Sequence, residues 1–278
     1  MGAPEDEFLT LRLQRQAYAK VLMGARKLSY GILNILGVFV IVYFVPTILA
    51  YAVGGLQNAE QQIAPALVLF APIGMIGVFT VGLLMVLIFA IFFIAMTSLA
   101  FSAFKSISKG TDLIHDGMRM LGRIGAPGPG PFHEGDSLLM LGVTIIGVGA
   151  VPLLIAITPG SPLGSLGLFI VQLAIDVAFA LIAIGLITLG IAFWKCGSTC
   201  GQSDVKEGGA AIVVGMTLFL LSWGTILVFQ FSPAMVHLRL NMATLLSLMP
   251  ALPAYCVLGF IAAYAGVVRT YVGIRRLL

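Results

Sequence analysis

The sequence predicts an all-α protein, a polytopic membrane bundle of about six transmembrane helices, and three observations predict it. Charged residues make up 9% of the chain and apolar residues 60%, whereas a soluble domain has roughly 25% and 45–50%. Apolar runs long enough to cross a bilayer recur along the chain, with short polar segments between them. Every Lys and Arg except Arg239 lies at a chain end or on alternate connectors. Lipid is therefore the expected solvent for most of this surface.

Residues 1–27 precede the first apolar run and carry their charges in order. Acidic residues come first, and five basic residues follow, which suits the dipole of a helix. Leu11, Tyr18 and Leu22 share one face of that helix. We expect a cytoplasmic N-terminal helix lying at the membrane surface. A solvated helix without lipid contact fits the same pattern.

Residues 28–278 are expected to form the six-span membrane domain. The uncharged stretch 61–104 is long enough for two crossings. Two crossings would put the connector that begins at Lys105 on the side opposite to the N-terminal basic residues, so charge favours one net crossing. Residues 105–134 then form a cytoplasmic linker with a second surface helix. The expected spans are 28–53, 72–103, 137–157, 166–194, 209–231 and 253–270.

Orientation follows from the positions of the basic residues. Loops rich in Lys and Arg remain in the cytoplasm. The N-terminal segment, the linker 105–134, the connector after Trp194 and the C-terminal end are the basic ones. We therefore predict a multi-pass protein of the cell membrane with both termini cytoplasmic.

Short motifs recur at similar places and suggest internal repetition. HEG precedes LGV, and KEG precedes VGM, at the same spacing in two parts of the chain. AFK, FWK and VVR each end an apolar run with one basic residue. The chain is thus predicted to consist of three similar hairpins, roughly 28–104, 135–195 and 208–274. Convergence is the alternative, because such residues are common at membrane boundaries.

The segment GIAFWK with its polar turn, the following EGG and the final LGFIAAYAGVVRTYVGIRRL carry a resemblance. They resemble archaeal multi-span membrane proteins of an uncharacterised family, over about the latter two thirds of the chain. The resemblance implies a polytopic cell-membrane protein without an established activity, and it transfers no functional residues.

Asp176 is the ionisable residue within an expected span. A carboxylate in hydrocarbon costs ~2.5–3.5 kcal/mol on insertion scales, so it should face other helices. Gln172 lies one helical turn away. The functional interpretation is an intramembrane polar site for a proton or cation. The alternative is a packed, hydrogen-bonded Asp176 whose partner is Gln172 or a hydroxyl group such as that of Thr144, Thr217 or Ser222.

Other candidate residues favour packing over chemistry. Gly259, Gly266 and Gly273 recur every seven residues and predict a smooth face for close helix approach. Cys196 and Cys200 are spaced C-x₃-C, which lacks the paired CxxC or added His of a metal site. We expect no catalytic residues, no cofactor and no metal.

The sequence favours a structural or accessory membrane component over a catalyst. Its expected partners are the lipid bilayer and either another membrane protein or further copies of this chain, and no nucleic acid. A small proton- or cation-coupled transporter or channel that uses Asp176 is the alternative. A membrane-embedded enzyme has the least support.

Overall fold

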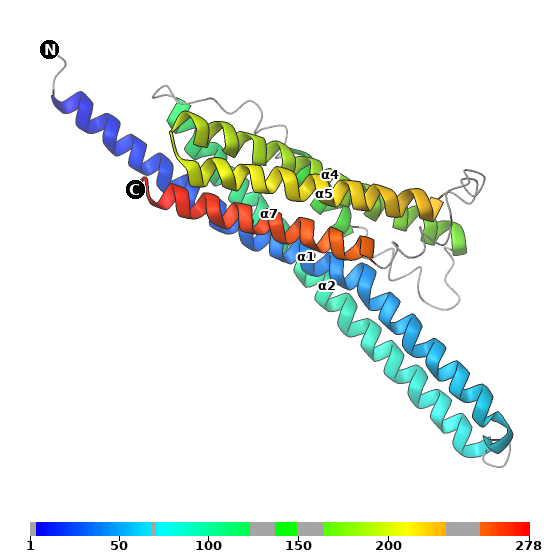
Figure 1. Cartoon of the computed structure of the whole chain (residues 1–278). Helices are drawn as coiled ribbons and strands as arrows, with labels where there is room; N and C mark the ends of the chain where they lie inside the picture. Colours follow the sequence, from blue (N-terminus) through cyan, green and yellow to red (C-terminus); the bar gives the residue numbers. More distant parts are fainter. Residues whose placement is uncertain (1–3, 68–70, 123–136, 149–163, 232–250) are drawn as a thin grey trace, which may run out of the picture.

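The computed structural model describes residues 4–67, 71–122, 137–148, 164–231 and 251–278, in which all regular structure is helical. Figure 1 shows the long helices, which are α1 (Pro4–Leu67), α2 (Ala71–Gly122), α4 (Gly164–Thr199), α5 (Ser203–Phe231) and α7 (Ala251–Arg275). A shorter apolar helix covers Ser137–Val148.

Five of the described helices are long and apolar enough to cross a membrane. The prediction of an all-α fold is confirmed for the described residues, and these five helices agree with a multi-pass protein. The expected third span, 137–157, is described only over Ser137–Val148. The count of six spans and the three-hairpin arrangement stay predictions.

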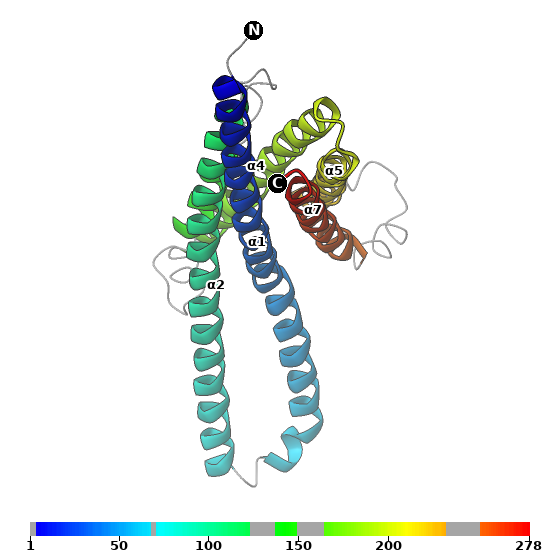
Figure 2. The same cartoon turned by 90° about the vertical axis from the view of Figure 1, so that its left-hand side faces the viewer.

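The two N-terminal helices are far longer than a bilayer is thick. α1 has 64 residues and α2 has 52. At ~1.5 Å per residue they measure about 96 and 78 Å, against ~30 Å of hydrocarbon. They run side by side, and Figures 1 and 2 show that the part of the pair nearest the α1–α2 connection extends away from the other helices.

The structure differs from the expected boundary at residue 27, because α1 passes through it without a break. Ala17, Val21 and Ala25 are buried, and the same face continues with Leu28 and Ile32. This spacing of three and four residues keeps one apolar stripe against the neighbouring helices on both sides of residue 27. Residues 4–27 therefore extend the axis of the first expected span instead of forming a separate helix.

The expected linker 105–134 also begins inside a helix. α2 continues to Gly122, and Ile107, Ile114 and Leu121 are buried at intervals of seven residues. The predicted second surface helix is thus a continuation of α2, packed on α1. Residues 54–65, expected as a connector, likewise belong to α1.

The helices α4, α5 and α7 pack beside the middle of α1. α5 contacts both α4 and α7, and α7 also contacts α1. Large side chains that are at most 1% exposed fill the centre, and they come from four helices: Phe39, Phe179, Phe219, Trp223 and Phe260. This aromatic cluster lies at one level of the bundle and fixes how the helices meet.

Large apolar side chains also cover the outside of the helices. Ile94, Phe101, Val214 and Leu221 are each between 66% and 70% exposed. Monomeric soluble proteins rarely expose apolar surface on this scale. The outward faces indicate a hydrocarbon environment, in agreement with a multi-pass membrane protein.

One end of the bundle gathers the polar termini of the helices. The start of α1 and both ends of the α4–α5 turn lie there, as does the C-terminal end of α7 (Figure 1). Basic residues of the described chain concentrate in these helix ends. We call this region the basic end.

Candidate functional site

Asp176 lies on α4 in the centre of the bundle and is 0% exposed. The indole Nε1 of Trp223, on α5, donates a hydrogen bond of 3.4 Å to the backbone carbonyl oxygen of Asp176. Phe179 lies one turn further along α4 and is equally buried. The acidic side chain thus belongs to a helix that the aromatic cluster holds in place.

The partners expected for Asp176 have different surroundings. The side chain of Gln172 lies outside the residues whose side chains the structure describes. Thr144 donates its hydroxyl hydrogen to the carbonyl oxygen of Met140 in its own helix, at 2.7 Å, and Thr217 is exposed. Ser222 is 6% exposed and adjoins Trp223 in sequence. Among the three proposed hydroxyl residues, Ser222 is the one in the buried layer.

Phe39 is the centre of the aromatic cluster. Its ring centroid lies 5.4 Å from that of Phe179, 5.7 Å from Phe219, 5.6 Å from Trp223 and 5.8 Å from Phe260. The pairs with Phe179, Phe219 and Trp223 are edge-to-face, and the pair with Phe260 is tilted. Edge-to-face pairs contribute about 0.5–1.5 kcal/mol each beyond the area they bury. One α1 side chain therefore ties α4, α5 and α7 together.

The glycines of α7 lie against glycines of α5 or against its first turn. A Cβ atom on Gly266 would stand 2.6 Å from the carbonyl oxygen of Gly208, and one on Gly259 would stand 2.6 Å from that of Gly215. Gly273 faces the first turn of α5, where the Cβ of Asp204 would be 2.9 Å away. A side chain at any of these positions would force the helices apart.

A second pair of small-residue faces joins α1 and α2, and sequence reasoning missed Gly24, Gly110 and Gly117. A Cβ on Gly24 would lie 2.6 Å from the carbonyl oxygen of Gly110, and one on Gly117 would lie 2.8 Å from that of Ala17. Gly31 packs against Ile107. The signal was available, because Ala17, Gly24 and Gly31 are spaced by seven residues as the α7 glycines are. Because basic residues lie close to them in the sequence, this segment was expected to be a polar surface helix.

Ion pairs join the helices at the basic end. Lys20 of α1 donates to Asp116 of α2 at 2.9 Å. Asp204, in the first turn of α5, accepts from Arg276 and lies 3.5 Å from Nε of Arg269. Asp204 is 17% exposed, so its two partners are more solvent-exposed than the acid they share. This end is held by charge as well as by packing.

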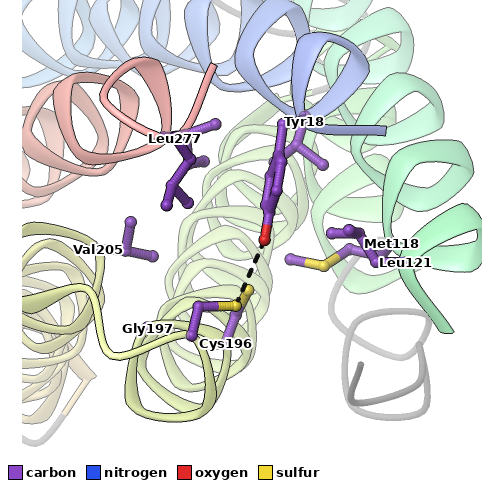
Figure 3. A pocket seen from close by; sticks show the side chains of 10 residues that line it. Tyr18, Met118, Leu121, Cys196, Gly197, Val205 and Leu277 are labelled. Carbon is purple, nitrogen blue, oxygen red and sulfur yellow. Dashed lines mark hydrogen bonds between the residues drawn. The ribbon is translucent and has the colours of Figure 1, made fainter. Parts of the chain in front are cut away.

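A small pocket opens between the helices at the same end, which we call the thiol pocket. Figure 3 shows the side chains of Tyr18 and Met118 reaching into it, opposite Cys196 of α4. Five helices contribute to its lining, which consists of Tyr18, Val21, Met118, Leu121, Cys196, Gly197, Cys200, Val205, Ile274 and Leu277. None of these ten residues is charged.

The α4–α5 turn sets the positions of the two cysteines. Gly201 has φ of 67°, a left-handed conformation that glycine adopts without strain. The amide of Gln202 donates to the carbonyl oxygen of Gly197 at 2.9 Å, the six-residue hydrogen bond that ends many helices. Cys200 is thereby the first residue of the turn, and Cys196 lies four residues earlier on the same face.

The Cys200 thiol has an unusual environment. Tyr18 Oη and Cys200 Sγ share a hydrogen bond of 3.8 Å in which either group can donate. A hydrogen bond from the Cys196 thiol lowers the pKa of Cys200 to about 6, burial opposes this change, and the bond with Tyr18 adds to it. Cys200 lies in the turn beyond the apolar part of α4 and is partly exposed. Its thiolate is therefore available near neutral pH.

Comparison of the chain with protein-family models, with curated proteins and with solved structures found no match. The resemblance to archaeal multi-span membrane proteins stays a prediction. The candidate sites therefore depend on the geometry alone.

The geometry distinguishes two places where chemistry could occur. Asp176 offers one buried carboxyl within an apolar, closely packed interior. The thiol pocket offers two thiols, a thioether and a phenol between five helices. Among the described residues no three His, Cys, Asp or Glu side chains form a group that could hold a metal ion.

Proposed function

We propose that this chain is a structural or accessory component of the cell membrane that assembles with another membrane protein or with further copies of itself. One observation carries the proposal. α1 and α2 continue beyond the bundle as a pair that contacts no other described helix along its outer part (Figures 1 and 2). A pair of helices longer than the bilayer is thick presents surface to a partner on both sides of the membrane.

Packing of the described interior supports a scaffold. Glycine faces bring α5 against α7 and α1 against α2 at backbone distance. The buried hydroxyl groups of Thr111 and Thr270 donate to carbonyl oxygens of their own helices. A closely packed interior of this kind favours a rigid support over a conduction path. The position of the basic residues favours both termini in the cytoplasm.

Co-purification in mild detergent tests the proposal. The full chain, extracted from its native membrane, should bring down a partner in fixed proportion or elute as a defined oligomer. Ile94, 66% exposed on α2, provides a surface variant. We expect Ile94→Trp to reduce the recovered partner, whereas Val214→Trp, at a similarly exposed position on α5, should not. Recovery of the chain as a lone monomer would contradict the proposal.

A proton- or cation-coupled transporter is the second candidate, and the complete burial of Asp176 favours it. Buried ionisable groups in membranes often mark ion pathways. Flux in proteoliposomes tests it, with Asp176→Asn as the variant and Asp116→Asn, at the basic end, as the control. Ion flux that Asp176→Asn abolishes and the control retains would establish transport. Absence of flux in the natural chain would reject it.

A further inference from the structure

We propose that the thiol pocket binds one monovalent soft metal ion of the Cu(I) class, held by the sulfur atoms of Cys196 and Cys200 with the thioether of Met118 as a third ligand. The site goes beyond the proposed scaffold function and does not depend on it.

Three sulfur-bearing side chains line one pocket although they come from two distant parts of the chain. Cys196 and Cys200 lie four residues apart at the end of α4, so their side chains share a helix face. Met118, on α2, is 5% exposed and lines the same pocket, and Figure 3 shows it opposite Cys196. The pocket thus brings a buried thioether and a buried thiol to one place in the fold.

The ligand types determine which metal ion would fit. Thiolate and thioether sulfur select soft ions, and Cu(I) is the first-row ion that accepts few sulfur ligands. Structural Zn²⁺ sites require four N or S ligands, whereas the pocket lining offers three sulfur atoms and neither a histidine nor a carboxylate. Mg²⁺ and Ca²⁺ require oxygen ligands. The composition therefore favours a monovalent ion over the common divalent ones.

The surroundings suit the charge that such a site would have. Two thiolates and one monovalent cation give a net charge of about −1, and the pocket lies at the basic end, beside Lys195 and Lys206 in sequence. The hydroxyl of Tyr18 is within hydrogen-bond distance of Cys200 Sγ. Hydrogen bonds to ligating atoms orient them and tune the bound metal. Tyr18 would thus be a positioning residue and not a ligand.

Access also favours the site. Cys200 is partly exposed at the end of the bundle, so an ion can reach it without crossing the apolar interior. Metal ligation requires thiolates and releases protons.

Competition with a colorimetric Cu(I) chelator tests the site. The full chain, purified in mild detergent under reducing conditions, should withhold about one Cu(I) per chain from the chelator. Cys196→Ser and Cys200→Ser should abolish this retention, and Met118→Leu should reduce the affinity. Cys256→Ser is the matched control, because Cys256 is a buried thiol of α7 outside the pocket. That variant should retain Cu(I) as the natural chain does.

Folding and metal identity require their own readouts. Each variant should elute as a single species, and Met118→Leu preserves an apolar side chain of similar size if a serine variant fails to fold. X-ray absorption of the Cu(I)-loaded chain should show a first shell of sulfur only. Equal retention by Cys200→Ser and the natural chain would overturn the proposal, as would a Zn²⁺ affinity at least equal to that for Cu(I). Unchanged affinity in Met118→Leu would refute the thioether ligand.

Discussion

Gly215 and Gly259 face each other across α5 and α7, and a Cβ atom on either would lie 2.6 Å from the carbonyl oxygen of the other. Gly215→Ala should therefore destabilise the protein, because backbone atoms on both sides leave no room for a methyl group. Overpacking of this kind costs typically 1–3 kcal/mol. Thermal unfolding in detergent, followed by circular dichroism, measures the change.

The control for this substitution lies on the same helix. No atom would come within 4 Å of a Cβ on Gly224. Gly224→Ala should leave the unfolding temperature unchanged or raise it, because alanine favours helix by about 1 kcal/mol over glycine. Equal destabilisation by the two substitutions would mean that the α5–α7 approach is looser than described.

Phe39→Ala should produce the largest loss of stability among single truncations in the bundle. Phe39 is 0% exposed and contacts four aromatic side chains. Replacement of a buried Phe by Ala costs about 3–5 kcal/mol. Val40→Ala, on the outward face of the same helix at 37% exposure, is the comparison. A similar drop in the unfolding temperature for both variants would contradict a central role for Phe39.

Asp204→Asn should weaken the α5–α7 contact at the basic end. The substitution leaves Arg269 and Arg276 without the carboxylate they share and removes a favourable acid from the first turn of α5. Asp116→Asn removes a more exposed pair with Lys20, and exposed pairs contribute little because water and salt screen them. The unfolding temperature of Asp204→Asn should fall further, and added salt should reduce the difference. Equal shifts without salt dependence would argue against the shared pair.

Alkylation of Cys200 should follow the thiolate and so rise with pH around a midpoint near 6. The Cys196 thiol and the Tyr18 hydroxyl both stabilise that thiolate. Cys196→Ala and Tyr18→Phe should therefore raise the midpoint toward the ordinary value for cysteine. Rates of iodoacetamide labelling between pH 5 and 9, read by mass spectrometry, give the profile.

The sign of the linked stability change follows from the same pKa. Cys200 is deprotonated in the folded chain above about pH 6, whereas the unfolded chain retains the proton until about pH 9. Stability from this group is fully present above pH 9 and is lost as pH falls through 6. A labelling midpoint near 8.5 in the natural chain would refute the shift.

Membrane-impermeant labelling tests the predicted orientation. In a chain whose cysteines are replaced by serine, Ser198→Cys lies at the basic end of α4 and should react only after the membrane is permeabilised. Ser161→Cys, in the connector expected outside, should react in intact cells. The reverse pattern would place the termini outside.

The sequence predicted the helical fold through composition and apolar runs, since these depend on local properties of the chain. It predicted spans at 28–53 and 72–103 but not the continuation of those helices to Pro4 and Gly122. The reason is that charged residues on the outer face of a packed helix resemble a polar connector in one dimension. Ala17 and Val21 are buried only because α2 returns beside them.

The candidate sites divide in the same way. Asp176 could be identified from the sequence because it is a single acidic residue within a long apolar run. The thiol pocket was not identifiable, because Tyr18 and Met118 approach Cys196 and Cys200 only after three helices have met. Spacing along the chain records the i, i+4 cysteine pair alone. A ligand from a distant helix leaves no local signal.

An unbroken α1 means that the outer tip and the basic end belong to one stiff rod. If α1 tilts about the level of Phe39, its two ends move in opposite directions. We therefore expect a partner that displaces the end of α1 nearest α2 to change the distance between the side chains of Tyr18 and Cys200 at the basic end.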